Sequence, residues 1–210
     1  MKSIFIIYMP GHAGNFLTRL FSLSPETIPQ VPISNLISGE IPVFNNRAEY
    51  YSFEHVKDQY SNWQDFHRVW PDFYQHELFD YFNTVFPEPF SYVIYAIHPH
   101  EFLMYENIIK KRNDSHFYHV TLSADYHSWV LESQQKLKFT YRPSYDGELA
   151  KLNDLKIKYS STSIDLDNII KSPETFVAEY LKVARSMQLT PDLVSAQRLY
   201  QGWINVRGPK

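Results

Sequence analysis

The feature that most constrains the fold is an apolar run that stops abruptly at a glycine turn. Residues 3–8 read Ser-Ile-Phe-Ile-Ile-Tyr, and a continuous Ile-rich run of this length is typical of a strand buried on both faces of a parallel sheet. Gly11 and Gly14 break the chain directly after it, and residues 15–21 carry apolar side chains at helical spacing. The order of strand, glycine turn and helix predicts the opening unit of an α/β fold.

The rest of the chain continues this alternation of strands and helices. Further strands are predicted at residues 90–97, 116–122 and 161–166, with a short edge strand at 136–141. Helices are predicted at residues 49–70, 73–86, 101–111, 124–134, 145–155, 172–187 and 191–206, and Pro-rich residues 24–46 are predicted to be mostly loop. The pair Ser172-Pro173 fits an N-cap followed by the first helical position. The alternation predicts one domain over residues 1–210, with a parallel, doubly wound sheet flanked by helices.

Composition excludes several classes of function. The net charge of −3 and the pI near 6.3 argue against a nucleic-acid partner. The chain has no Cys, which excludes disulfides, thiolate zinc sites and a cysteine nucleophile and fits a reducing compartment. Its first apolar run is too short for a signal peptide, and no later run approaches the length of a membrane span. We therefore expect a cytoplasmic protein with no membrane partner.

The glycine turn is a candidate anion site. The first N–H groups of a helix and the positive end of its dipole attract anions, and glycines let the backbone approach a ligand closely. A Walker A loop needs the pattern Gly-x-x-x-x-Gly-Lys-Ser/Thr, and this loop has neither that glycine spacing nor a Lys. A plain strand-to-helix turn is the alternative, and the position directly after the first strand favours the anion site.

Two segments resemble the sulfotransferases that use PAPS (3′-phosphoadenosine 5′-phosphosulfate). Residues 9–17, Met-Pro-Gly-His-Ala-Gly-Asn-Phe-Leu, resemble the loop of that family, Pro-Lys-x-Gly/Ala-Gly-Thr-x-x-Leu in generic form. Residues 164–174 resemble its strand-end stretch Tyr-Glu-Asp-Leu-Leu-x-x-Pro, which a long helix follows. The resemblance implies an α/β fold of the P-loop nucleotide-binding type. It also implies transfer of a sulfuryl group from PAPS, as co-substrate, to a hydroxyl acceptor that the sequence does not identify.

The resemblance also implies which residues bind the co-substrate. In the family the loop wraps the 5′-phosphosulfate of PAPS, and other residues bind its 3′-phosphate. The residues of this chain at the matching loop positions are Gly11, His12, Ala13, Gly14, Asn15 and Phe16. For the 3′-phosphate the chain has no clear match, and the candidates are Ser123 and Ser128, which fall in the corresponding region, and Arg207 near the C-terminus. Arg207 matches only a short Arg-Lys-Gly segment, and a frayed C-terminal tail is the alternative.

The chain departs from the family at the loop lysine. Gly11 stands where the family has Lys, a cation that would neutralise the charge building on the bridging oxygen during transfer. Loss of one preorganised donor can cost ~3 kcal/mol of transition-state stabilisation. His12 is the nearest side chain that could replace it, and Arg19 is a more distant source of charge. No Arg lies near Ser123 and Ser128 to complete the 3′-phosphate site.

The sequence His98-Pro99-His100 follows the strand predicted at residues 90–97. Open α/β sheets bind ligands beyond the carboxyl ends of their strands, and His98 resembles the base that deprotonates the acceptor in many sulfotransferases. Histidine suits that role because its pKa lies near working pH. His100 is interpreted as an ordinary loop histidine. A metal cluster of these two residues with His116 and His119 is disfavoured by Pro99, so no metal is expected.

Three hypotheses therefore remain open. The first is a PAPS-dependent sulfotransferase with His98 as base and His12 as donor to the bridging oxygen. The second is a non-catalytic nucleotide- or anion-binding module of the same fold, which the missing Lys favours. The third is a small P-loop kinase, against which stands Asn15 after Gly14 in place of the Lys and Ser/Thr that such an enzyme uses.

Overall fold

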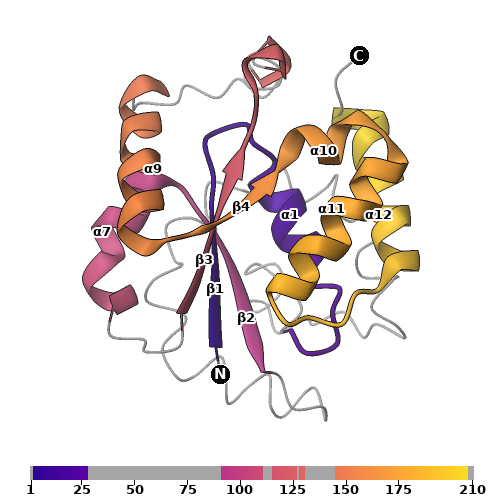
Figure 1. Ribbon diagram of the computed structural model, residues 1–210, viewed down its shortest axis with the longest axis horizontal. Coiled ribbons are helices and arrows are strands. Elements are labelled where there is room, and N and C mark those ends of the chain that lie inside the picture. Colours follow the sequence, from indigo (N-terminus) through magenta and orange to yellow (C-terminus); the bar gives the residue numbers. More distant parts are fainter. Residues whose placement is uncertain (1, 28–90, 111–114, 127, 131–144, 208–210) are drawn as a thin grey trace, which may run out of the picture.

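The computed structural model describes residues 2–27, 91–110, 115–126, 128–130 and 145–207 (Figure 1). Several predicted elements lie outside these residues. They are the helices at 49–70 and 73–86, most of the Pro-rich loop at 24–46, and the edge strand at 136–141.

The described core is a four-stranded, all-parallel sheet. Its strands are β1 (Lys2–Ile7), β2 (Tyr92–Ile97), β3 (Ser115–Thr121) and β4 (Thr162–Asp165), in the order β2-β1-β3-β4. The predicted parallel sheet is confirmed, with strand ends displaced by at most two residues. β1 pairs on both sides, and its Ile4, Ile6 and Ile7 are fully buried, which accounts for its continuous apolar run.

Helices cover both faces of this sheet, so the described part of the molecule has three layers (Figure 1). The helices α7 (Pro99–Lys110) and α9 (Tyr145–Tyr159) lie on one face. The other face carries α1 (Gly14–Phe21), α10 (Leu166–Lys171), α11 (Pro173–Ser186) and α12 (Leu193–Arg207). Within the described ranges, no helix is long and apolar enough to cross a membrane.

The topology marks one end of the sheet as the place for a ligand. The chain passes from β1 outward to β2, and then returns past β1 to β3 and β4. The direction of winding therefore reverses between β1 and β3, and open parallel sheets bind ligands beyond the carboxyl ends of the strands at such a switch point. In Figure 1 the strands run upward from the side of the N-terminus, so their carboxyl ends face the upper side of the molecule.

Two local predictions need correction. The last strand ends at Asp165 instead of residue 166, because the Asp165 carboxylate accepts a hydrogen bond from the Asn168 backbone N–H at 3.2 Å and caps α10. The helix predicted from residue 124 begins as a 3₁₀ turn, η1 (Ala124–Tyr126). The predicted start of α11 is confirmed, with Ser172 and Thr175 forming a reciprocal capping box.

Candidate functional site

The loop between β1 and α1 uses two left-handed residues to turn at the switch point. Gly11 has φ 85° and Ala13 has φ 55°, and the His12 backbone N–H donates to the Met9 carbonyl at 2.9 Å. A left-handed alanine costs about 1–2 kcal/mol, whereas glycine adopts this region freely. Ala13 provides no side-chain cap for α1, and the first turn of α1 contains no acidic residue. The loop therefore ends at a helix start that is suited to an anion.

Gly14 is required for packing inside this loop. A Cβ atom at Gly14 would lie 2.4 Å from three ring carbons of Tyr8, closer than any real contact. From the sequence, Gly14→Val is expected to abolish anion binding with little loss of fold, and the second half of this expectation is wrong because the added side chain would collide with Tyr8. Any side chain at Gly14 must displace the buried Tyr8 ring, so loss of binding in that variant would not identify an anion site.

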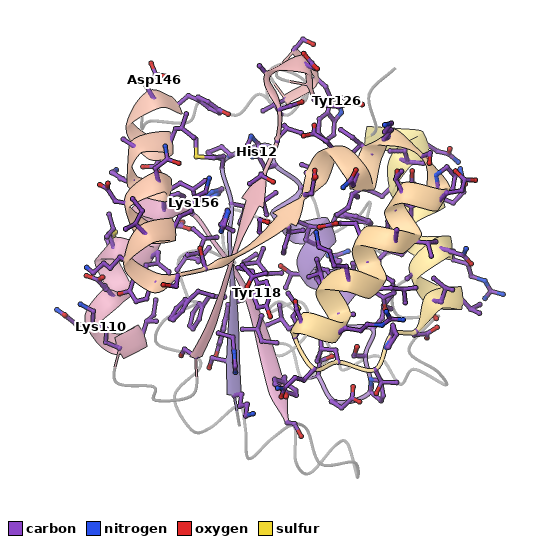
Figure 2. All side chains as sticks on the ribbon, viewed as in Figure 1. His12, Lys110, Tyr118, Tyr126, Asp146 and Lys156 are labelled. Carbon is purple, nitrogen blue, oxygen red and sulfur yellow. The ribbon has the colours of Figure 1, made fainter. Side chains whose placement is uncertain are left out.

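His12 turns from the loop toward α9. Its side chain is buried, and Nε2 lies 3.3 Å from the Tyr145 hydroxyl at the first residue of α9. Figure 2 shows His12 at the upper edge, on the side where α9 begins with Tyr145 and Asp146. Burial, together with the charge of Asp146, raises the pKa of Tyr145, so its hydroxyl keeps its proton and can act as donor or acceptor toward His12.

His98 caps the start of α7. Its backbone N–H donates to the Glu101 carboxylate at 3.0 Å, and its carbonyl accepts the Phe102 N–H at 2.9 Å. The ring Nδ1–H donates to the Tyr8 carbonyl at 3.1 Å. Because a carbonyl can only accept, the neutral His98 ring carries its proton on Nδ1 and its lone pair on Nε2. His98 is buried, with 9% of the residue exposed.

His100 makes a second strand-end contact that the sequence analysis missed. Its ring Nδ1 and its backbone N–H both lie within 3.1 Å of one carboxylate oxygen of Glu148, on α9. Glu148 is fully buried, and its other oxygen binds the Lys151 ammonium at 2.7 Å. Pro99 occupies the first turn of α7 with Glu101, a helix-start signature that could have placed His100 on a helix.

The predicted nucleotide-binding residues beyond the β1–α1 loop fall into two groups. One group surrounds Trp203 of α12, whose ring stacks on Phe16 at 4.2 Å and meets Trp129 edge-on at 6.0 Å. Ser128 precedes Trp129, and Arg207 ends α12 one turn after Trp203. The structure thus joins Phe16 to the segment after β3 and to α12 through Trp203, and the backbone at Arg207 is helical instead of a frayed tail.

Ser123 belongs to the other group. Its backbone N–H and its hydroxyl each donate to the Asp167 carboxylate at 2.9 Å, on an exposed surface beyond β3. Asp167 lies in the first turn of α10. A carboxylate beside Ser123 repels a phosphate unless the Asp167 side chain moves away.

The two histidines of β3 do not form a common site. His116 and His119 point to opposite faces of β3 because their spacing is odd. His119 Nδ1 lies 2.8 Å from the Ser161 hydroxyl, and burial with the charge of Lys156 lowers the pKa of His119 to about 4. Among the residues that the structure describes, no three His, Cys, Asp or Glu side chains are grouped to hold a metal ion.

The carboxyl edge thus combines a helix start suited to an anion with three histidines of different surroundings. His12 contacts a tyrosine, His98 a neutral carbonyl and His100 a buried carboxylate. Such an edge can bind an anion and exchange protons with it. No protein-family model matches the chain, and no curated protein matches it in a sequence search.

Proposed function

We propose that the carboxyl edge of the sheet, with the β1–α1 loop, binds the 5′-phosphosulfate of PAPS, and that the protein transfers the sulfuryl group to a hydroxyl acceptor. The observation that supports this proposal is the position of the β1–α1 loop. It lies at the switch point of a parallel sheet and leads into a helix with no side-chain cap and no acidic residue in its first turn. Backbone N–H groups of residues 13–15 would then hold the anion, because the His12 backbone N–H is already bonded to the Met9 carbonyl.

In the proposed reaction the acceptor hydroxyl oxygen forms a bond to sulfur. A histidine after β2 takes the hydroxyl proton, and His98, with its lone pair on Nε2, is the candidate that the sequence supplies. The bond between sulfur and the bridging oxygen breaks, and its electron pair leaves with the phosphate oxygen of 3′,5′-ADP. His12 donates a hydrogen bond to that oxygen in place of the absent loop Lys.

A binding module without transfer activity is the second candidate. The positive φ of Gly11 supports it, because a side chain introduced there to restore the Lys would be strained. The burial of His12 against Tyr145 also supports it, since His12 must then reach the bridging oxygen from a packed position.

The test is PAPS-dependent sulfuryl transfer to a panel of sugar, metabolite and tyrosyl hydroxyls. We expect the wild type to transfer, with a bell-shaped pH profile because the base must be neutral and His12 must donate. His12→Asn should slow transfer by on the order of a hundredfold, whereas His116→Gln, at an exposed position near the amino end of β3, should not. Binding of 3′,5′-ADP without transfer to any acceptor would leave the binding module as the function.

A further inference from the structure

The side chain of Glu148 is a buried carboxylate with three donors around it. Its Oε2 accepts from the His100 backbone N–H at 3.1 Å and from the His100 Nδ1 at 3.0 Å. Its Oε1 accepts from the Lys151 ammonium at 2.7 Å. Burial alone would raise the pKa of Glu148, but the hydrogen bonds from Lys151 and His100 outweigh it and hold the pKa below its usual value. The carboxylate is therefore ionised at neutral pH.

We propose that Glu148 orients His100, and that His100 Nε2 is the proton acceptor of this site. An ionised carboxylate can only accept hydrogen bonds, so the proton of the neutral ring lies on Nδ1 and the lone pair on Nε2. When the ring takes a second proton, the same carboxylate stabilises the imidazolium, as the buried carboxylate does in hydrolytic triads. Glu148 is thus a positioning residue, and His100 is the group that touches the ligand.

His100 is better suited to this role than His98. Both rings carry the lone pair on Nε2, and their centroids lie 6.0 Å apart in parallel planes. The Nδ1 partner of His98 is the neutral Tyr8 carbonyl, which stabilises a cation less than a carboxylate does. The His100 side chain is also part-exposed, at 28%, whereas His98 is buried. His100 therefore has both the counter-charge and the access that a base needs.

This inference deepens the proposed function and rests on it for the identity of the reaction. The proton comes from the acceptor hydroxyl as its oxygen bonds to sulfur, and it resides on His100 Nε2. His98 then remains as the N-cap of α7 and as the neighbour that packs beside His100.

The first measurement does not depend on sulfuryl transfer. Long-range ¹H–¹⁵N NMR spectra of the full chain at neutral pH report which ring nitrogen of each histidine carries the proton, with His100→Gln assigning the His100 signals. We expect His100 in the Nδ1–H tautomer. A ring protonated on Nε2 alone would overturn the proposal, whatever the protein transfers.

The second measurement compares transfer rates in four variants. His100→Gln should lower the rate by on the order of a hundredfold or more, the scale of a positioned general base, without changing the affinity for 3′,5′-ADP. Glu148→Gln should lower it less, and the matched control Glu179→Gln, a buried carboxylate that contacts no histidine in the described residues, should leave it unchanged. A wild-type rate in His100→Gln, or a loss confined to His98→Gln, would overturn the assignment.

The two proposals fail in distinguishable ways. A wild type that neither binds 3′,5′-ADP nor transfers contradicts the proposed function, and the tautomer alone then decides whether Glu148 orients His100. If the wild type transfers and His100→Gln transfers at the same rate, the proposed function stands. The assignment of Glu148 and His100 as an orienting carboxylate and a proton acceptor is then wrong.

Discussion

Two buried carboxylates on opposite faces of the sheet are held in nearly the same way. Glu148 of α9 accepts from Lys151 and from the His100 backbone N–H just after β2. Glu179 of α11 accepts from Lys182 at 2.6 Å and from the Asp165 backbone N–H at 2.9 Å, at the last residue of β4. In each case a helix is fixed to a backbone N–H at or just beyond the end of a strand by a carboxylate that has a Lys three residues later.

The two clusters differ in one contact. Glu148 also binds the ring Nδ1 of His100, whereas the bonds of Glu179 within the described residues go to a backbone N–H and to Lys182. Two similar buried carboxylates can therefore differ in role: one only holds its helix in place, and the other also contacts a titratable ring. We therefore expect the two to contribute alike to stability and differently to chemistry.

Removing either carboxylate should have the largest effect on stability. Glu148→Ala and Glu179→Ala each leave a backbone N–H without its acceptor in a buried site, which costs about 1–3 kcal/mol. Lys151 and Lys182 are 39% and 56% exposed and can turn to water, so they add little to the loss. Urea unfolding of both variants measures this loss. A free energy of unfolding equal to that of the wild type in either variant would contradict the idea that both carboxylates hold their helices in place.

Acid should weaken the contacts by which Glu148 of α9 binds His100 and Lys151. The pKa of Glu148 is lowered in the fold from the ordinary value of 4.5, so its contribution to stability is fully present above that value and is lost as pH falls through the lowered pKa. Glu148→Gln should therefore flatten the dependence of the free energy of unfolding on pH below about 4.5. Urea unfolding at a series of pH values measures this, and an unchanged slope would show that Glu148 does not titrate differently in the folded state.

The lysines should matter least. Lys151→Met and Lys182→Met keep the aliphatic stem and remove a half-exposed charge, and exposed ion pairs contribute only about 0.2–1 kcal/mol. Both variants should lose a similar small amount of stability in urea unfolding. A loss of several kcal/mol in one variant alone would show that its carboxylate depends on the lysine for burial, and the two clusters would then not be equivalent.

The sheet was predictable from local signals, and the contacts of its carboxyl edge were not. The Ile-rich run predicts the buried strand β1, and the Ser172-Pro173 pair predicts the start of α11. Both predictions succeed because burial on both faces and helix capping depend on only a few neighbouring residues. The contact between Glu148 and His100 could not be predicted in this way, since the two residues are 48 positions apart in sequence. The sequence favours His98 over His100, and the contact of His100 with Glu148 becomes visible only through the packing of α7 on α9.

Gly14 and Ser123 are two further positions where the local sequence predicts the backbone but not the side-chain contacts. The glycine pattern predicts the turn correctly, but it does not reveal that the ring of Tyr8 fills the space beside Gly14. Ser123 lies after β3 as predicted, and its hydroxyl binds Asp167, which belongs to a short helix that the sequence analysis assigned partly to a strand.

The central claim is that the β1–α1 loop binds the anionic end of a nucleotide, and ligand-dependent melting tests it most directly. At a hundredfold excess over Kd, 3′,5′-ADP should stabilise the wild type by about 2.7 kcal/mol and raise its Tm, and ATP should do so only if the site is of the kinase type. Asn and Asp are the side chains found most often at positive φ, so the matched variants Gly11→Asn and Gly11→Asp should carry a similar strain at this position, but only Asp places a negative charge beside the anion. The account predicts that the Tm rise is retained in Gly11→Asn and lost in Gly11→Asp. No rise with either nucleotide in the wild type, or an equal rise in the two variants, would contradict it.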